Sequence, residues 1–129
     1  MGQVDSLEAL YQKHRDIAEF YVIYIREAHA ADSSWPVAYA TKQNINQPTT
    51  FRERCDVAHT LIRDKRLTIP CLVDDMDNKV DAAYQGHPTR LYVIDLDGAL
   101  AVAGASGPAG LRPALNDAQV WLREYRQSR

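Results

Sequence analysis

The run from Ala18 to Ile25 constrains the fold more than any other segment of this 129-residue chain. It is dense in aromatic and β-branched residues and shows no polar alternation, which is typical of a strand covered on both faces in a parallel sheet. Its unbroken apolar part, Phe20 to Ile25, is far shorter than the ~20 residues that a membrane helix needs. The segment therefore predicts a buried strand and gives no reason to expect a membrane span.

Helical and strand patterns alternate along the rest of the chain. Asp5 is predicted to cap a first helix that runs to Arg15, and Thr50 with Glu53 has the spacing of a capping box for a second helix. The predicted helices cover residues 5–15, 50–65 and 78–84, followed by a last helix with Pro113 in its first turn. The apolar face of the second helix is expected to consist of Phe51, Cys55, Ala58 and Ile62, and that of the last helix of Ala118, Trp121, Leu122 and Tyr125. The other predicted strands cover 70–74, 91–95 and 100–103. A long polar segment over 27–48 is expected to be a functional loop.

This order, α-β-α-β-α-β-β-α, predicts a single α/β domain over residues 1–129. The closing β-β-α part, with Pro88-Thr89 just before its first strand, resembles the end of thioredoxin-like domains. The resemblance implies a three-layer α/β/α sandwich around a central mixed sheet. It also implies that the His87–Pro88 bond is cis, since few X-Pro bonds are cis without such a reason.

Charge and cysteine content exclude several classes of partner. The net charge of −2 offers no electrostatic basis for binding nucleic acid or an anionic membrane. No secretion signal follows Met1, and two cysteines fit a reducing, cytoplasmic setting. Four scattered histidines without paired ligand spacing predict no metal site.

Two stretches resemble the iodothyronine deiodinases and their bacterial relatives. In the first, Tyr24, Glu27, Ala28 and His29 match the motif Tyr-x-x-Glu-Ala-His at a strand end, and a Ser/Asp/Trp-rich loop follows. The second contains Val73-Asp74-Asp75-Met76-Asp77-Asn78, Ala83-Tyr84, Arg90-Leu91-Tyr92-Val93 and the turn Gly104-Ala-Ser-Gly107-Pro108. The resemblance covers nearly the whole chain.

The resemblance implies reductive removal of iodine from iodothyronines by a selenocysteine or cysteine. It assigns Tyr24, Glu27 and His29 to proton relay and substrate holding, and Arg90 to substrate binding. The implied partners are a small aromatic, halogenated substrate and a thiol donor that serves as co-substrate, with no bound cofactor. A homodimer would cover exposed strand edges.

Two departures from the family pattern affect the expected site. The family usually has a histidine ahead of its second helix, where this chain has Gln47-Pro48-Thr49-Thr50. The family's Cys-x-x-Sec or Cys-x-x-Cys motif would precede the first helix, and neither Cys55 nor Cys71 lies there. An internal start codon, a real truncation or a degenerate domain would each account for this. Without the strand that bears the motif, we expect 18–25 to pair directly with 90–95, or the chain to be unstable alone.

Each candidate residue also has a purely structural interpretation. Tyr24 would be a core residue, Glu27 and His29 a polar strand end, and Arg90 part of a surface ion pair. Among the remaining groups, the structural interpretation is preferred: Cys55 and Cys71 as core filler, His14 and His59 as surface or partly packed, and residues 74–77 as a solvated strand end.

Three functions therefore remain open. The first is a deiodinase-like oxidoreductase whose nucleophile is absent from this chain. The second is a catalytically silent thioredoxin-like binding or scaffold domain. The third is a general thiol reductase or peroxiredoxin relative that uses Cys55 or Cys71.

Overall fold

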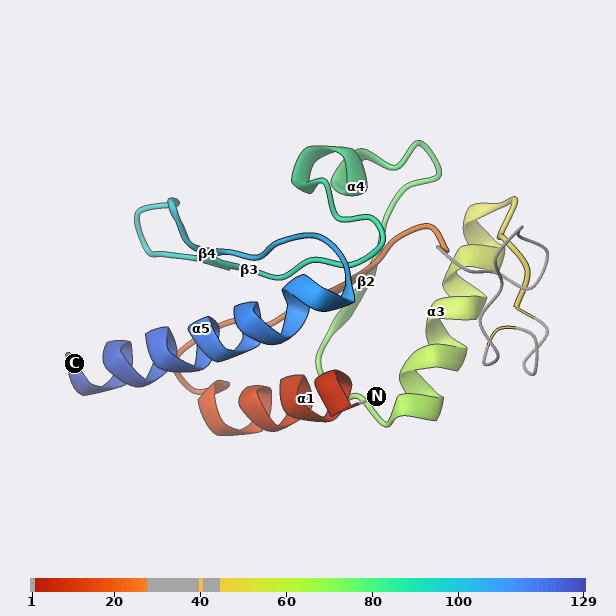
Figure 1. Ribbon diagram of the computed structural model, residues 1–129. Helices are drawn as coiled ribbons and strands as arrows, with labels where there is room; N and C mark the ends of the chain where they lie inside the picture. The colour runs from red at the N-terminus through yellow and green to blue at the C-terminus, as the bar shows by residue number, and fades with distance from the viewer. Residues whose placement is uncertain (1, 28–39, 41–44) are drawn as a thin grey trace. The chain divides into compact units, whose positions relative to one another are not determined.

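The structure is a computed structural model that describes residues 2–27, 40 and 45–129 (Figure 1). It is a mixed α/β structure of helices and small sheets, consistent with the expected thioredoxin-like class. The chain divides into two compact units, one of residues 1–21 with 89–129 and the other of residues 22–88. Each unit is described by itself.

The unit of residues 22–88 contains a parallel pair of strands and two helices. β1 (Val22–Tyr24) pairs with β2 (Cys71–Val73), with Ile23 opposite Leu72. Helix α3 (Phe51–Lys65) packs against β2, and α4 (Lys79–Tyr84) is a short helix that follows it. The predicted strand at 18–25 is therefore hydrogen-bonded to a parallel neighbour only over its last part.

The capping box of α3 is formed as predicted. The Thr50 hydroxyl accepts from the backbone N–H of Glu53 at 3.1 Å, and the Glu53 carboxylate accepts from the N–H of Thr50 at 3.2 Å. These bonds satisfy two of the N–H groups that a helix start leaves free. The expected apolar face of this helix is only partly right, because Ala58 is buried whereas Phe51 is 46% exposed.

The other unit contains an antiparallel hairpin and two long helices. α1 (Gly2–His14) lies beside α5 (Pro108–Gln127), and β3 (Tyr92–Ile94) pairs with β4 (Leu100–Ala103) (Figure 1). The core forms where α1 meets α5, around four buried residues: Leu10, Leu115, Ala118 and Leu122. The predicted apolar stripe of the last helix is thus confirmed at its buried positions.

Three helix predictions need correction. α1 begins at Gly2, so Asp5 lies inside its first turn, where a carboxylate interacts favourably with the helix dipole, and does not cap it. α5 begins at Pro108, and Pro113 lies inside it. His14 is 1% exposed, whereas we expected a surface or partly packed side chain; its place on the inward side of α1 explains the burial.

Gly110 permits this early start of α5. A Cβ at residue 110 would lie 2.1 Å from the carbonyl oxygen of Ala105, far inside van der Waals contact. Glycine therefore lets the first turn of α5 fold back against the loop that follows β4.

The sheets differ from the expectation in one respect. The parallel and antiparallel pairings of a mixed sheet are both present, but they form two separate two-stranded sheets. β1 bonds β2 and β3 bonds β4. The predicted direct pairing of 18–25 with 90–95 would join the two units, so it stays a prediction. The alternative expectation, instability of the isolated chain, stays a prediction. The His87–Pro88 bond is cis, as expected.

Candidate functional site

Tyr24 is the last residue of β1, and the parallel ladder fixes its backbone. It lies opposite Val73 of β2, and its carbonyl accepts from the N–H of Asp74 at 2.9 Å. Tyr24 is partly buried, on the same face of the strand as Val22. The sheet therefore holds this phenol at the carboxyl end of a parallel strand.

The Tyr24 hydroxyl donates a hydrogen bond to the carboxylate of Glu27. Burial, and then the hydrogen bond and negative charge of Glu27, raise the pKa of Tyr24 far above its usual value. Tyr24 therefore remains a proton donor across the physiological range. The pair has the composition of an acid–base relay, in which a carboxyl group carries the proton and a phenol orients it.

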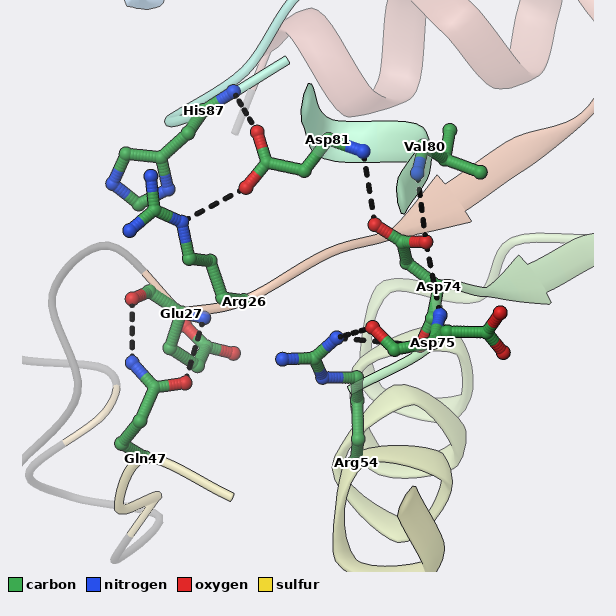
Figure 2. A network of polar contacts seen from close by, with 9 residues as sticks. All are labelled: Arg26, Glu27, Gln47, Arg54, Asp74, Asp75, Val80, Asp81 and His87. Atoms are coloured by element: carbon green, nitrogen blue, oxygen red, sulfur yellow. Dashed lines mark hydrogen bonds and ion pairs between the residues drawn. The ribbon is translucent and has the colours of Figure 1, made fainter. Parts of the chain in front are cut away.

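The backbone of Glu27 is held by the side chain of Gln47. The Gln47 Oε1 atom accepts from the Glu27 N–H at 3.1 Å, and Nε2 donates to the Glu27 carbonyl at 2.8 Å (Figure 2). The side-chain amide of Gln47 thus forms hydrogen bonds with both backbone polar groups of Glu27.

Asp74 connects the end of β2 to the start of α4. Its carboxylate accepts from the N–H groups of Asp75, Val80 and Asp81 at 2.9, 3.0 and 2.9 Å (Figure 2). The residue is 2% exposed, so the expected solvated strand end is wrong at this position. Three backbone donors compensate for the removal of the carboxylate from water.

Asp81 continues this network toward Glu27. One of its oxygens accepts from the backbone N–H of His87 at 3.0 Å, and the other lies 2.8 Å from Nε of Arg26 (Figure 2). The Asp81 side chain is 7% exposed and that of Arg26 is 49% exposed. The buried carboxylate of Asp81 thereby holds both Arg26, which precedes Glu27, and His87, which precedes the cis-proline Pro88.

Arg54 places a positive charge beneath the same strand ends. It is 2% exposed, and its Nη1 donates to the carbonyls of Asp74 and Asp75 at 3.2 and 2.8 Å. Its charge acts on Tyr24 against the larger effects that raise the pKa of that phenol. Within the described part of the chain, its Nε has no hydrogen-bond partner.

The remaining candidates are placed as follows. His29 lies outside the described residues. Arg90 belongs to the unit of residues 1–21 and 89–129, where its Nη1 lies 3.4 Å from the Tyr92 hydroxyl. Among the described residues Arg90 forms no ion pair. The interpretation of Arg90 as part of a surface ion pair is therefore not supported. His59 is exposed, as expected.

Both cysteines are free thiols and are half-buried. The Cys71 thiol lies 3.6 Å from the Leu72 carbonyl, and burial raises its pKa. A raised pKa lowers the fraction of thiolate, which is the reactive form of the thiol.

Among the described residues, no three His, Cys, Asp or Glu side chains gather into a group that could hold a metal ion. No helix of the described chain is long and apolar enough to span a bilayer.

Comparison with known families adds to this geometry. The model of the iodothyronine deiodinase family matches residues 1–126. The chain belongs to the iodothyronine deiodinase family. This membership confirms the resemblance inferred from the sequence motifs, and the family is of the thioredoxin-like α/β kind.

Individual deiodinases are similar over most of this chain. Thyroxine 5-deiodinase of Sparus aurata is 31% identical over 129 residues, which cover 98% of this chain and 45% of that protein. Type I iodothyronine deiodinase of Xenopus laevis is 34% identical over 113 residues, covering 86% and 42%. Type II iodothyronine deiodinase of Neoceratodus forsteri is 30% identical, covering 98% and 48%. The chain therefore spans less than half the length of these curated relatives.

The structure joins two of the predicted site residues, Tyr24 and Glu27, and adds four residues that sequence reasoning missed. These are Gln47, Arg54, Asp74 and Asp81. Asp74 was detectable in principle, because an aspartate at a strand end shortly before a short helix can accept from that helix's first N–H groups. Nothing in the sequence pattern pairs Gln47 with Glu27 across 20 residues.

Proposed function

We propose that this chain is the scaffold of an enzyme that reductively removes iodine from an aromatic, iodothyronine-like substrate. The observation that carries the proposal is the hydrogen bond between Tyr24 and Glu27, in a chain that matches the deiodinase family over residues 1–126. A proton-carrying pair at a strand end is what this chemistry requires beside its nucleophile.

The reaction has two balanced steps. A thiolate or selenolate attacks the iodine, so a chalcogen–iodine bond forms, the carbon–iodine bond breaks, and the carbon takes up a proton. Two thiols of a reductant then become a disulfide, which releases iodide, restores the chalcogen anion and frees two protons. A thiol co-substrate is therefore required, and no bound cofactor is.

Within this scheme, Glu27 delivers the proton to carbon and Tyr24 orients its carboxyl group. The raised pKa of Tyr24 supports this division, since the phenol keeps its own proton. His29 joins the relay, and Arg90 binds the substrate.

The attacking chalcogen is proposed to come from outside residues 1–129. The burial that raises the Cys71 pKa makes that thiol a poor nucleophile at neutral pH. In a longer form of the protein that contains the nucleophile, a Cys55→Ser, Cys71→Ser double variant that deiodinates as well as that longer parent would support this origin. Loss of activity in the double variant would favour the third reading, a thiol reductase that uses its own cysteines.

The decisive experiment compares two forms of the protein. The first is the 129-residue chain. The second is a longer form to which a segment with a Cys-x-x-Cys or Cys-x-x-Sec motif is joined ahead of Met1, taken from the gene's own in-frame upstream sequence or from a family member. Each form is mixed with dithiothreitol and labelled thyroxine, and both thyroxine binding and iodide release are measured. We expect binding by both forms and release only by the longer one. Absence of binding by both forms would overturn the proposal.

A binding or scaffold domain is the second candidate, favoured by the raised pKa of the half-buried Cys71 thiol. It predicts thyroxine binding by both forms with no iodide release by either. A Glu27→Gln variant separates the two functions: it would retain binding in both cases but would lower iodide release only in an enzyme.

A further inference from the structure

Glu27 lies beyond the end of β1, yet both of its backbone polar groups are hydrogen-bonded as in a β-ladder. β1 ends at Tyr24, three residues earlier. The Gln47 amide nevertheless accepts from the Glu27 N–H and donates to its carbonyl, at 3.1 and 2.8 Å. This reproduces the exchange of two bonds between opposed residues of an antiparallel ladder, with a side chain in place of the second strand.

Gln47 is itself attached to a well-fixed element. Pro48, which follows it, is buried. Thr49 then donates from both its N–H and its hydroxyl to the Glu53 carboxylate at 2.8 Å, next to the capping box that starts α3. The amide therefore reaches Glu27 from a segment anchored to the start of a helix.

We propose that Gln47 is a positioning residue, whose amide fixes the backbone of Glu27 so that the Glu27 carboxylate stays on the Tyr24 hydroxyl. The effect on catalysis rests on the function proposed above, whereas the effect on geometry does not. Glutamine suits this task because its amide supplies one acceptor and one donor at adjacent atoms. A glutamate there would place an oxygen against the Glu27 carbonyl, with no proton to share.

The contact of the preceding residue, Arg26, is independent of Gln47. The Arg26 side chain donates to the carboxylate of Asp81 on α4. Loss of the Gln47 amide should thus release Glu27 locally and leave the neighbouring residue in place. The expected change is a loosened backbone at one residue in a folded protein.

The test uses Gln47→Ala and Gln47→Glu, with Asn46→Ala as the matched control, since Asn46 is the exposed neighbour on the same segment. Hydrogen exchange measured by NMR on the full chain reports the Glu27 N–H directly. We expect its exchange rate to rise about tenfold or more in Gln47→Ala, to rise less in Gln47→Glu, whose carboxylate can still accept from this N–H, and to stay unchanged in Asn46→Ala. Circular dichroism checks that each variant is folded. A Glu27 N–H that exchanges equally slowly in the folded Gln47 variants would overturn the proposal.

The catalytic consequence is read in the longer, nucleophile-containing form. Misplacement of a reacting group costs about tenfold to a hundredfold in rate, so kcat for iodide release should fall by that factor in Gln47→Ala, with KM little changed. An altered KM at constant kcat would overturn the catalytic role. If the parent protein releases no iodide while the exchange result holds, the proposed function fails and the positioning role stands.

Discussion

The Nε atom of Arg26 lies 2.8 Å from a carboxylate oxygen of Asp81, and the two partners differ greatly in exposure. The arginine is half in solvent, whereas the aspartate is buried and also accepts from the His87 N–H. Asp81 is therefore mainly a buried acceptor for two donors. A surface ion pair alone would contribute little to the free energy of unfolding.

Replacing Asp81 should destabilise the unit of residues 22–88. In Asp81→Ala, the His87 N–H and the Arg26 guanidinium both lose their acceptor, and we expect a loss of about 1–3 kcal/mol in the free energy of unfolding. Urea titration measures it. The control is Asp77→Ala, at a carboxylate with a 58% exposed side chain, which should change stability by less than about 0.5 kcal/mol. Equal effects of the two variants would contradict this account of Asp81.

Asp74 should be more sensitive than Asp81. Asp74→Asn puts an NH₂ group among three backbone donors, so at least one buried N–H is left without an acceptor. We expect this to cost about 2–4 kcal/mol, above the usual price of one unsatisfied group because a charge-assisted network is broken. Asp75→Asn is the neighbouring control, with a 63% exposed side chain, and should be nearly neutral. A neutral Asp74→Asn would refute the assigned role.

His14 should make stability depend on pH. Burial, and then the positive charges of Arg126 and Lys13, lower the pKa of this imidazole from its ordinary 6.5; Arg123 acts in the same direction and Asp16 opposes it. The unfolded chain therefore takes up the proton first as pH falls. The stability contribution is fully present above pH 6.5 and is lost as pH falls below it.

Thermal unfolding between pH 8 and pH 5 tests this. The parent and the His59→Gln control should lose stability on acidification, and His14→Gln should lose less of it, since no histidine then has to stay neutral at that position. His59 is exposed and provides the comparison. Parallel pH profiles for parent and His14→Gln would exclude the effect.

Tyr24 should not ionise while the protein is folded. Burial and the hydrogen bond to Glu27 raise the pKa of Tyr24, so Tyr24→Phe should leave the phenolate absorbance of the folded chain unchanged while the exposed tyrosines titrate. In guanidinium chloride, the same substitution should remove one-seventh of the amplitude, because the chain has 7 tyrosines. A reduced amplitude in the folded variant would show that Tyr24 is not held as described.

Local signals in the sequence predicted the elements whose cause is local. The Thr50–Glu53 capping box and the buried positions of the last helix follow from spacings of three and four residues, and both are confirmed. The Asp5 cap failed because nothing in residues 2–4 stops a helix from starting earlier. Strand length was overestimated at 18–25, because an apolar run fixes burial but not the extent of hydrogen bonding.

Much of the candidate site could not be predicted in this way. Asp74 and Asp81 occur in an acidic segment that looks solvated, and only the return of α4 toward β2 buries their carboxylates. The bond from Gln47 to Glu27 depends on where two distant segments meet. Motif resemblance found Tyr24 and Glu27 because the two residues are three apart in one strand end.

The close approach at Gly110 has a consequence for how the sequence can vary. Since even one methyl group there would collide with the Ala105 carbonyl, every single-nucleotide missense change at that codon should be purged in a saturation library selected for folding. A substitution at residue 110 would be tolerated only after a second mutation that moves the loop at Ala105. Natural variants carrying a side chain at residue 110 should therefore also carry insertions or deletions between residues 104 and 109.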